Sequence, residues 1–459
     1  MSEPGLLDLP LAEQAAAVAG GADPEQLLDA ALARIEERNE AVNAVVETFP
    51  EQSRQMLRDA PDGPLRGVPL VIKDEWPLPW RAQRFGAAEM LSPTAPGESG
   101  PYRALRDTGA VIVGVANMHE WGASSTGNES VYGAARNPWD TERCPGGSSS
   151  GPGAAVGARI VAGAVGADGI GSIRYPAAYC GITGLKPTFG RSAMEGHHVR
   201  NTTTIVSGPM CTDAAGCRVL GAALFGAEIP AGDAAGLRIG VVRGPVAEDC
   251  SDAVRSACEL AIEALASETG GSVREIELPG LDLSGMASVI VGSSEGLGRL
   301  TPAKVNSISE RIGMINRALT KYRMLLPGSV LAKAGVIRTL MRRSLAAAFA
   351  EVDAIAWPTV PAVAPPLTEP VVELPSGTMP ADAANPRGGG LANLTGIPAV
   401  SVPVGFDEGL PIGLQLQGAW GADALLLDAA EALERATERR WVDALSPVAG
   451  GAGAPSAAS

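Results

Sequence analysis

The sequence predicts an α/β protein, because short apolar runs typical of strands alternate with helical patterns along the chain. The clearest case begins at residues 237–242, a predicted strand that is followed by a helix over 251–267 and a strand over 273–278. Such a βαβ unit predicts two parallel strands joined by a right-handed crossover. We therefore expect a sheet that is covered by helices on both faces.

The other elements follow from local signals. Asp23 and Pro24 form an N-cap and first-turn pair, with Gln26 at the third position, which predicts a helix within a helical N-terminal part of about 10–60. The small-residue run 154–165 predicts a tightly packed helix. Further strands are predicted at 68–72, 111–115, 355–357, 399–404 and 412–416, and a further helix at 422–437.

Composition excludes several classes of protein. The 459 residues carry 36 Lys and Arg against 51 Asp and Glu, a net charge of −15, which disfavours broad contact with nucleic acid or an anionic membrane. There is no run of 18 apolar residues, so no membrane span is expected, and no basic-then-apolar leader, so we expect a cytoplasmic protein. The six cysteines lack zinc spacing and predict reduced, mostly buried thiols.

The segment 299–343 departs from this acidic average, with ten Lys and Arg and the single acid Glu310. It is interpreted either as a pair of amphipathic helices with a solvated basic face, or as a pocket wall or partner surface for an anion. Sequence alone does not choose between these.

Two segments rich in Gly and Ser, residues 145–151 and 168–174, are the most unusual part of the chain. Glycine allows several backbone N–H groups to converge on one point, where they can stabilise an anion. Acyl transfer needs such an oxyanion site beside a nucleophilic hydroxyl, so these segments are candidate catalytic loops.

A serine nucleophile also needs a base, and the candidates are few. His197 and His198 lie in a polar stretch, whereas Lys73 follows the predicted strand 68–72 and would end at the edge of a sheet. Desolvation there would favour a neutral amine that can act as a base. The alternative is an ordinary strand-end lysine paired with Asp74, and the residues alone leave both open.

An ordered set of motifs resembles the amidase signature family. They are Gly67-Val68-Pro69 with Lys73-Asp74, Pro145-Gly146-Gly147-Ser148-Ser149, Gly171-Ser172-Ile173-Arg174, Gly184-Leu185-Lys186-Pro187-Thr188, Asn393-Leu394-Thr395-Gly396 and Gly409-Leu410-Pro411-Ile412. The resemblance covers roughly residues 25–440, with a weak middle at 215–350. It implies an amidase signature fold, with a large mixed central β-sheet flanked by helices on both faces, in one domain over 1–445. The composition of residues 446–459, rich in Gly, Ala, Pro and Ser, predicts a disordered tail.

The resemblance also implies an activity. The chain would hydrolyse a carbon–nitrogen amide bond of a small molecule through an acyl-serine intermediate, with no metal or organic cofactor. It would use a Ser-cisSer-Lys triad with Lys73 as base, Ser148 as the bridging serine after a cis peptide bond, and Ser172 as nucleophile. Its oxyanion hole would use the backbone N–H groups of Gly169, Ile170, Gly171 and Ser172. A homodimer is compatible with the resemblance.

The chain departs from the family pattern near these residues. Ile170 stands where the family commonly has glycine; a β-branched residue disfavours positive φ, and it narrows the space beside the nucleophile. Residues 75–80, with two Trp and two Pro, replace a Thr-Gly segment and form either a stiff wall near Lys73 or a packed surface loop. Residues 122–127 replace a segment that often lines the acyl pocket, so Ala123 and Ser124 are candidate substrate contacts.

Three other functions compete with this one. The same triad would serve a glutaminase-type subunit of a tRNA-dependent amidotransferase, which would need a partner protein. A serine esterase would use Ser149 within Gly147–Gly151 and His197 or His198, but no strand-like run precedes that motif. A scaffold that has lost activity is disfavoured because all three triad residues are present.

Overall fold

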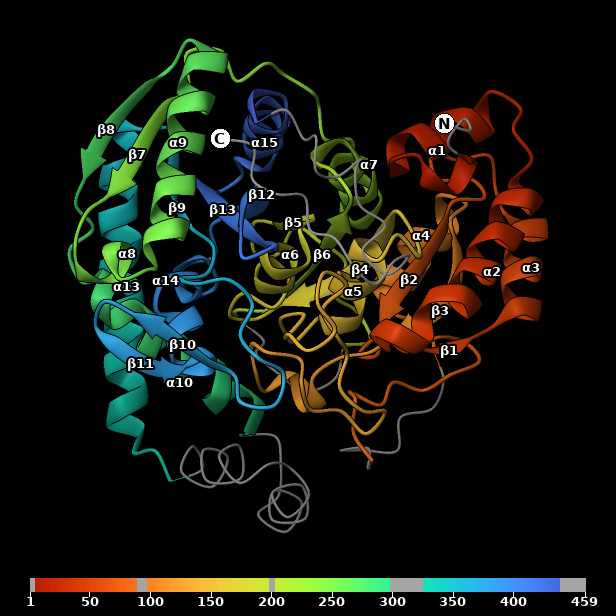
Figure 1. Cartoon of the computed structure of the whole chain (residues 1–459), viewed down its shortest axis with the longest axis horizontal. Coiled ribbons are helices and arrows are strands. Elements are labelled where there is room, and N and C mark those ends of the chain that lie inside the picture. The colour runs from red at the N-terminus through yellow and green to blue at the C-terminus, as the bar shows by residue number, and fades with distance from the viewer. Residues whose placement is uncertain (1–4, 89–96, 198–202, 298–324, 438–459) are drawn as a thin grey trace.

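The computed structural model describes residues 5–88, 97–197, 203–297 and 325–437. One large sheet runs through the molecule, with β1 and β3 toward one end and β7 and β8 toward the other (Figure 1). In spatial order its eleven strands are β1 (Val45–Thr48), β3 (Val111–Ala116), β2 (Pro69–Lys73), β4 (Gly163–Asp168), β6 (Val206–Cys211), β5 (Thr183–Lys186), β12 (Ala399–Asp407), β13 (Leu410–Gly418), β9 (Ala354–Pro358), β7 (Arg238–Val242) and β8 (Ser272–Ile276).

The sheet is mixed, as the resemblance predicts. Strands β3, β2 and β4 are parallel to one another, and so are β9, β7 and β8. The strands between these two groups pair in antiparallel fashion. A separate two-stranded ribbon is formed by β10 (Val371–Leu374) and β11 (Gly377–Pro380).

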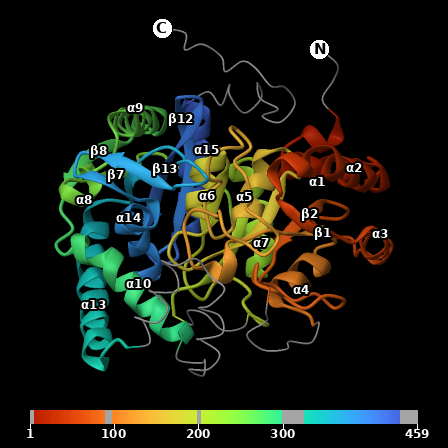
Figure 2. The same cartoon turned by 60° about the horizontal axis from the view of Figure 1, so that its bottom comes forward.

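Helices cover both faces of the sheet, which confirms the predicted fold class (Figure 2). Successive strand residues point to opposite faces, so Leu70 and Ile72 pack in one core cluster while Val71 packs in another. The first cluster includes side chains of α4 (Gly100–Asp107), α7 (Ala214–Phe225), α9 (Asp252–Thr269) and α15 (Asp423–Ala436). The opposite face carries α2 (Pro24–Val42) and α5 (Ser150–Gly157), and further along α10 (Leu281–Leu297), α13 (Gly328–Glu351) and α14 (Ala381–Thr395).

The remaining elements are shorter or lie at the margins. They are η1 (Leu6–Asp8), α1 (Leu11–Ala19), α3 (Pro50–Asp59), η2 (Glu120–Gly122), α6 (Arg174–Cys180) and α8 (Pro245–Glu248). Because Lys73 is two residues beyond Val71 on β2, its side chain lies on the face that carries α5.

Most predicted elements are confirmed. Helix α2 begins at Pro24, and the Asp23 carboxylate accepts the Glu25 N–H at 2.9 Å. The predicted βαβ unit is β7, α9 and β8, with the two strands parallel. All six cysteines are free and buried. None of the helices in the described ranges is long and apolar enough to cross a membrane.

One prediction is wrong. The run 154–165 is not a single helix: α5 ends at Gly157, and β4 begins at Gly163. Arg159 has a φ of 58°, which ends the helical geometry. The sequence signal failed because β4 is buried on both faces, and such a strand has no alternation that separates it from a buried helix.

Some predictions fall outside the described residues. The tail 446–459 lies outside them, as does the basic segment up to residue 324. The rest of that segment is described from residue 325 and lies largely in α13, where Arg342 Nε donates to the Thr395 carbonyl at 3.0 Å.

Candidate active site

Lys73 and Ser148 meet on the face of the sheet that carries α5. Lys73 is the last residue of β2, its side chain is 1% exposed, and its Nζ donates to Ser148 Oγ at 2.9 Å. The peptide bond between Gly147 and Ser148 is cis, as the resemblance predicts. The His119 N–H donates to the Ser148 carbonyl at 3.1 Å and holds this segment in place. The strand end therefore presents a buried amine directly to a serine hydroxyl.

Ser172 lies between the end of β4 and the start of α6, and it is partly exposed. The N–H of Ser149 donates to the Ser172 carbonyl at 3.2 Å, which ties the two Gly/Ser segments together. Within the described residues, the Ser172 hydroxyl makes no side-chain hydrogen bond. A partly exposed hydroxyl with no such partner is available for contact with a substrate.

The loop before Ser172 is shaped by close packing. Gly171 has a φ of 122°, and a Cβ at that position would lie 2.0 Å from Tyr175 Cζ, so a residue with a side chain does not fit. The Tyr175 hydroxyl donates to the carbonyls of Ile170 and Asn385, which orients the loop. Ile170 has no positive φ, so its β-branched side chain is accommodated.

The amides of this loop are not equivalent. Gly171 N–H donates to Asp168 Oδ1 at 2.6 Å, so in this structure it is engaged with a carboxylate. Among the described residues, the N–H groups of Gly169, Ile170 and Ser172 have no hydrogen-bond acceptor. These three are therefore the better candidates for an oxyanion hole, and the role of Gly171 stays a prediction.

A buried polar network supports the loop from below. Arg174 Nε donates to Asp168 Oδ2 at 3.1 Å, and both side chains are fully buried. Arg174 also donates to Gln415 at 2.9 Å and to Asn393 at 2.7 Å. Burial would raise the pKa of Asp168, but the charge and hydrogen bonds of Arg174, together with Lys186 and Asn393, outweigh it and lower that pKa. The network keeps Asp168 ionised at the base of the Ser172 loop.

Glu75 is the site residue that the sequence analysis missed. Its carboxylate Oε1 lies 3.0 Å from Lys73 Nζ, and its Oε2 lies 3.5 Å from His197 Nε2. Asp74, the partner considered from sequence, points elsewhere: it pairs with Arg81 at 2.6 Å. Glu75 lies in the turn that follows β2, which ends at Lys73, so the alternation of the strand could not have identified it from sequence.

The pKa values of Lys73 and Glu75 are both lowered, but for different reasons. Burial lowers the pKa of Lys73, while the neighbouring charges of Glu75 and Asp168 act in the opposite direction. Burial would raise the pKa of Glu75, but the charge of Lys73 and the contact with His197 outweigh it and lower the pKa to about 2. Glu75 is therefore ionised at any working pH.

The candidate substrate contacts lie on a loop held by α14. Ser124 Oγ donates to Asp382 Oδ1 at 2.8 Å, and the Ser125 N–H donates to the same oxygen at 2.6 Å. Ala123 is partly exposed. Contact of Ala123 and Ser124 with substrate stays a prediction.

The geometry disfavours the esterase interpretation. Ser149 is fully buried, its hydroxyl donates to the Ala167 carbonyl at 3.1 Å, and it accepts the Ala167 N–H at 3.3 Å. His197 lies against Glu75 instead, and His198 lies outside the described residues. Ser149 therefore ties the start of α5 to β4 and is not presented to a base.

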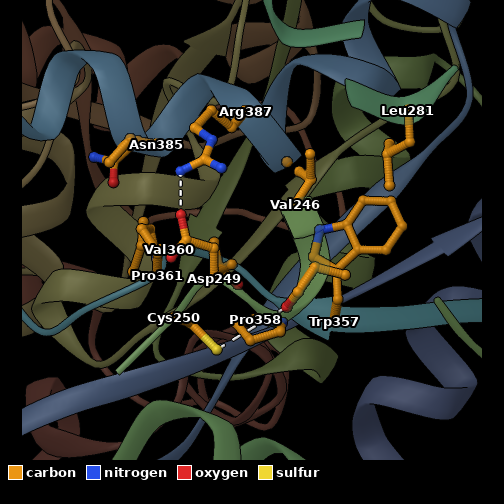
Figure 3. Close-up of a pocket in the computed structure, with 14 residues that line it drawn as sticks. Val246, Asp249, Cys250, Leu281, Trp357, Pro358, Val360, Pro361, Asn385 and Arg387 are labelled. Atoms are coloured by element: carbon orange, nitrogen blue, oxygen red, sulfur yellow. Dashed lines mark hydrogen bonds and ion pairs between the residues drawn. The ribbon is translucent and has the colours of Figure 1, made fainter. Parts of the chain in front are cut away.

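A separate hollow lies beside α14, and Figure 3 shows its lining. It encloses about 420 Å³, counting the part open to solvent, and none of Lys73, Ser148 and Ser172 lines it. Arg387 reaches across it to Asp249 at 2.5 Å. The carbonyl of Asn385, another lining residue, accepts from Tyr175 OH, which connects this wall to the Ser172 loop.

Comparison with known proteins gives the class to which this site belongs. A family model described as Amidase matches residues 26–427. The chain is 32% identical to one of the subunits of the glutamyl-tRNA(Gln) amidotransferase of Methylococcus capsulatus, over 90% of this chain and 93% of that protein. The chain therefore belongs to the amidase signature family.

Solved structures agree with this assignment. A crystal structure of an amidase superposes with a TM-score of 0.87 at 30% identity, covering 93% of this chain and 99% of that one. A 6-aminohexanoate cyclic dimer hydrolase superposes with a TM-score of 0.81 at 26% identity, covering 95% and 98%. The relatives of this chain thus include both hydrolases and a component of an amidotransferase.

Proposed function

We propose that the chain is an amidase that hydrolyses a small-molecule amide through an acyl-Ser172 intermediate. The observation that carries the proposal is the buried contact of 2.9 Å between Lys73 Nζ and Ser148 Oγ. A buried lysine that donates to a serine hydroxyl has few structural reasons to exist, because burying an amine costs free energy. The backbone hydrogen bond from Ser149 to Ser172 brings the second serine into the same site.

In the proposed mechanism, neutral Lys73 accepts the proton of Ser148 while Ser148 accepts that of Ser172. Ser172 Oγ attacks the amide carbonyl, and the N–H groups of Gly169, Ile170 and Ser172 stabilise the oxyanion. The proton then returns through Ser148 to the leaving nitrogen, and the C–N bond breaks. Water attacks the acyl-serine, with Lys73 and Ser148 again moving the proton, and releases the acid. Loss of one oxyanion donor typically lowers such a rate by about 10²–10³-fold.

The test is covalent labelling with a fluorophosphonate, followed by mass spectrometry of the intact protein and of its peptides. We expect one adduct on wild type, on the peptide that contains Ser172, and none on Ser172→Ala. Ser148→Ala should keep the nucleophile but label far more slowly, because the proton path to Lys73 is cut. Equal labelling of Ser172→Ala and wild type would overturn the proposal.

A second candidate is the role of an amidotransferase component that releases ammonia from glutamine. It is favoured by the 32% identity to the glutamyl-tRNA(Gln) amidotransferase chain over nearly the whole of both proteins. The proposed triad would serve either role, so the site residues do not separate the two.

Ammonia release distinguishes them. The purified chain is incubated with a panel of small linear and cyclic amides and, separately, with glutamine. Turnover of a panel amide by the chain alone, absent in Ser172→Ala, supports a free-standing amidase. Turnover of glutamine only, or only after addition of a partner protein, supports the amidotransferase role.

A further inference from the structure

Lys73, Glu75 and His197 form a buried series of titratable groups, of which the proposed mechanism uses only Lys73. The turn after β2 brings Glu75 back onto Lys73, since the N–H groups of Glu75 and Trp76 both donate to the Lys73 carbonyl, at 2.7 and 3.2 Å. The exposed fractions of the three side chains are 1%, 4% and 6%. The contact is therefore shielded from water and from salt.

Aromatic side chains enclose the far end of this series. The His197 ring lies 5.1 Å from the Trp76 ring and 6.0 Å from the Phe85 ring, measured between centroids. Trp76 is fully buried. The enclosure holds His197 against the second oxygen of the Glu75 carboxylate.

Few other charges act on this cluster within the described residues. Asp168, at the end of β4, is the second carboxylate whose charge acts on Lys73, and it is paired with Arg174. Asp74 is neutralised by Arg81 and accepts the N–H groups of Arg84 and Gly86. Glu75 is therefore the carboxylate in direct contact with Lys73.

Three oxygen atoms surround Lys73 Nζ. It donates hydrogen bonds to Ser148 Oγ at 2.9 Å and to the Ala167 carbonyl at 3.5 Å, and Glu75 Oε1 lies 3.0 Å away in an ion pair. When Lys73 loses a proton, the Ala167 carbonyl can hold one remaining N–H group, and the adjacent Glu75 carboxylate attracts the other. The nitrogen lone pair then points at Ser148 Oγ, which is the direction that the proposed proton transfer needs.

We propose that Glu75, held by His197, is a positioning residue that aims Lys73 at Ser148 and sets the pH at which Lys73 becomes an active base. This inference rests on the proposed function. The carboxylate favours the ammonium form, so it moves the onset of activity to higher pH, and it orients the amine once the proton has left.

The experiment measures the rate of Ser172 labelling by a fluorophosphonate over a pH range that spans the titration of histidine and lysine. Glu75→Gln keeps a polar side chain of the same size beside Lys73 but removes the negative charge. We expect the midpoint of the acidic limb to move about 1–3 units toward lower pH, with the high-pH plateau largely kept. Glu75→Leu should move the midpoint in the same direction and also lower the plateau, because the acceptor is lost.

His197→Gln is the second variant and keeps the proposal testable where Glu75→Gln does not fold. Without the contact from His197, more of the Glu75 charge acts on Lys73, so the midpoint should move toward higher pH. Glu195→Gln is the matched control: it removes a carboxylate two residues before His197 that lies mostly in solvent. We expect the wild-type midpoint in this control.

The outcomes separate this inference from the proposed function. If folded Glu75→Gln keeps the wild-type midpoint and loses only plateau rate, Glu75 is merely structural and the inference is wrong. Where that variant does not fold, an unchanged midpoint in His197→Gln has the same meaning. If wild type is not labelled at Ser172 at all, the proposed function itself fails, whatever the Glu75 variants do.

Discussion

The ends of β2 and β5 each carry a buried lysine, and their surroundings differ. Lys73 is the last residue of β2 and Lys186 the last residue of β5, with exposed fractions of 1% and 0%. Lys73 contacts a serine hydroxyl and a carboxylate. Lys186 donates to the Pro187 carbonyl at 2.7 Å and makes no ion pair with any residue in the described ranges.

Burial acts on both amines, but it does not make both into bases. It lowers the pKa of Lys186 to about 7, with Asp168 acting in the opposite direction, and it also lowers the pKa of Lys73. Among the described residues, however, Lys186 Nζ donates to a carbonyl and makes no hydrogen bond to a hydroxyl. The comparison teaches that a catalytic lysine needs a reaction partner as well as a dry environment.

The largest expected effect is the loss of Ser172 labelling in Lys73→Met, and Lys186→Met is the variant to compare with it. Lys73→Met should lower the rate of Ser172 labelling by about 10²–10⁴-fold, the usual contribution of a general base, while the protein stays folded. Lys186→Met should keep the labelling rate within about tenfold of wild type, since in the described part of the chain its amine donates to a carbonyl and to no reacting group. Labelling kinetics with thermal unfolding as the folding control measures both.

If Lys186→Met loses as much labelling as Lys73→Met, the proposed difference in role between the two lysines is wrong. It would show that the amine at the end of β5 also takes part in the reaction. The proposed assignment of Lys73 as the single base would then have to be revised.

The next effect concerns Asp168, whose charge acts on both lysines. Asp168→Asn leaves Arg174 as a buried charge without its carboxylate, and breaking such a pair typically costs about 3–5 kcal/mol of unfolding free energy. Denaturant unfolding measures this loss.

Asp353→Asn is the matched control for Asp168→Asn. Arg238 also contacts Asp353 through two nitrogens, at 3.0 and 2.6 Å, but those side chains are 46% and 31% exposed. Breaking that pair should cost far less unfolding free energy, because solvent screens both charges. Equal losses of unfolding free energy in the two variants would show that burial of the Asp168–Arg174 pair does not raise the cost of breaking it.

Lys186 also predicts a pH dependence of stability. Its pKa of about 7 in the folded protein is below the ordinary value of 10.5, so the unfolded chain binds more protons between these values. Stability should therefore rise with pH across that window, by up to about 1.4 kcal/mol per unit, and this component should be absent in Lys186→Met. Unfolding free energies of both proteins over that pH window measure it; parallel curves would contradict the prediction.

The smallest effect is expected for Ser149. Ser149→Ala removes two hydrogen bonds to Ala167 and should lower the unfolding free energy by about 0.5–1.5 kcal/mol for each bond. Labelling at Ser172 should persist. Loss of labelling with normal stability would instead restore Ser149 as the candidate nucleophile.

Local sequence signals were reliable where one element carried its own pattern. The cap at Asp23 located α2, and the alternation of strand and helix around α9 predicted the parallel pair β7 and β8. The same reasoning wrongly predicted one helix over 154–165, because β4 lies in the interior of the sheet and is buried on both faces. Burial removes the polar positions from which a period can be read.

The order of motifs was enough to predict the family, and the resemblance to that family then predicted the cis peptide bond before Ser148 and the mixed sheet. The carboxylate that pairs with each buried cation could not be predicted from the sequence. Asp74 is next to Lys73 in sequence yet pairs with Arg81, while Glu75 turns back to Lys73 and meets His197 from a segment more than a hundred residues away. Which charges share a dry space is decided only when distant segments pack, because desolvation depends on everything that surrounds a group.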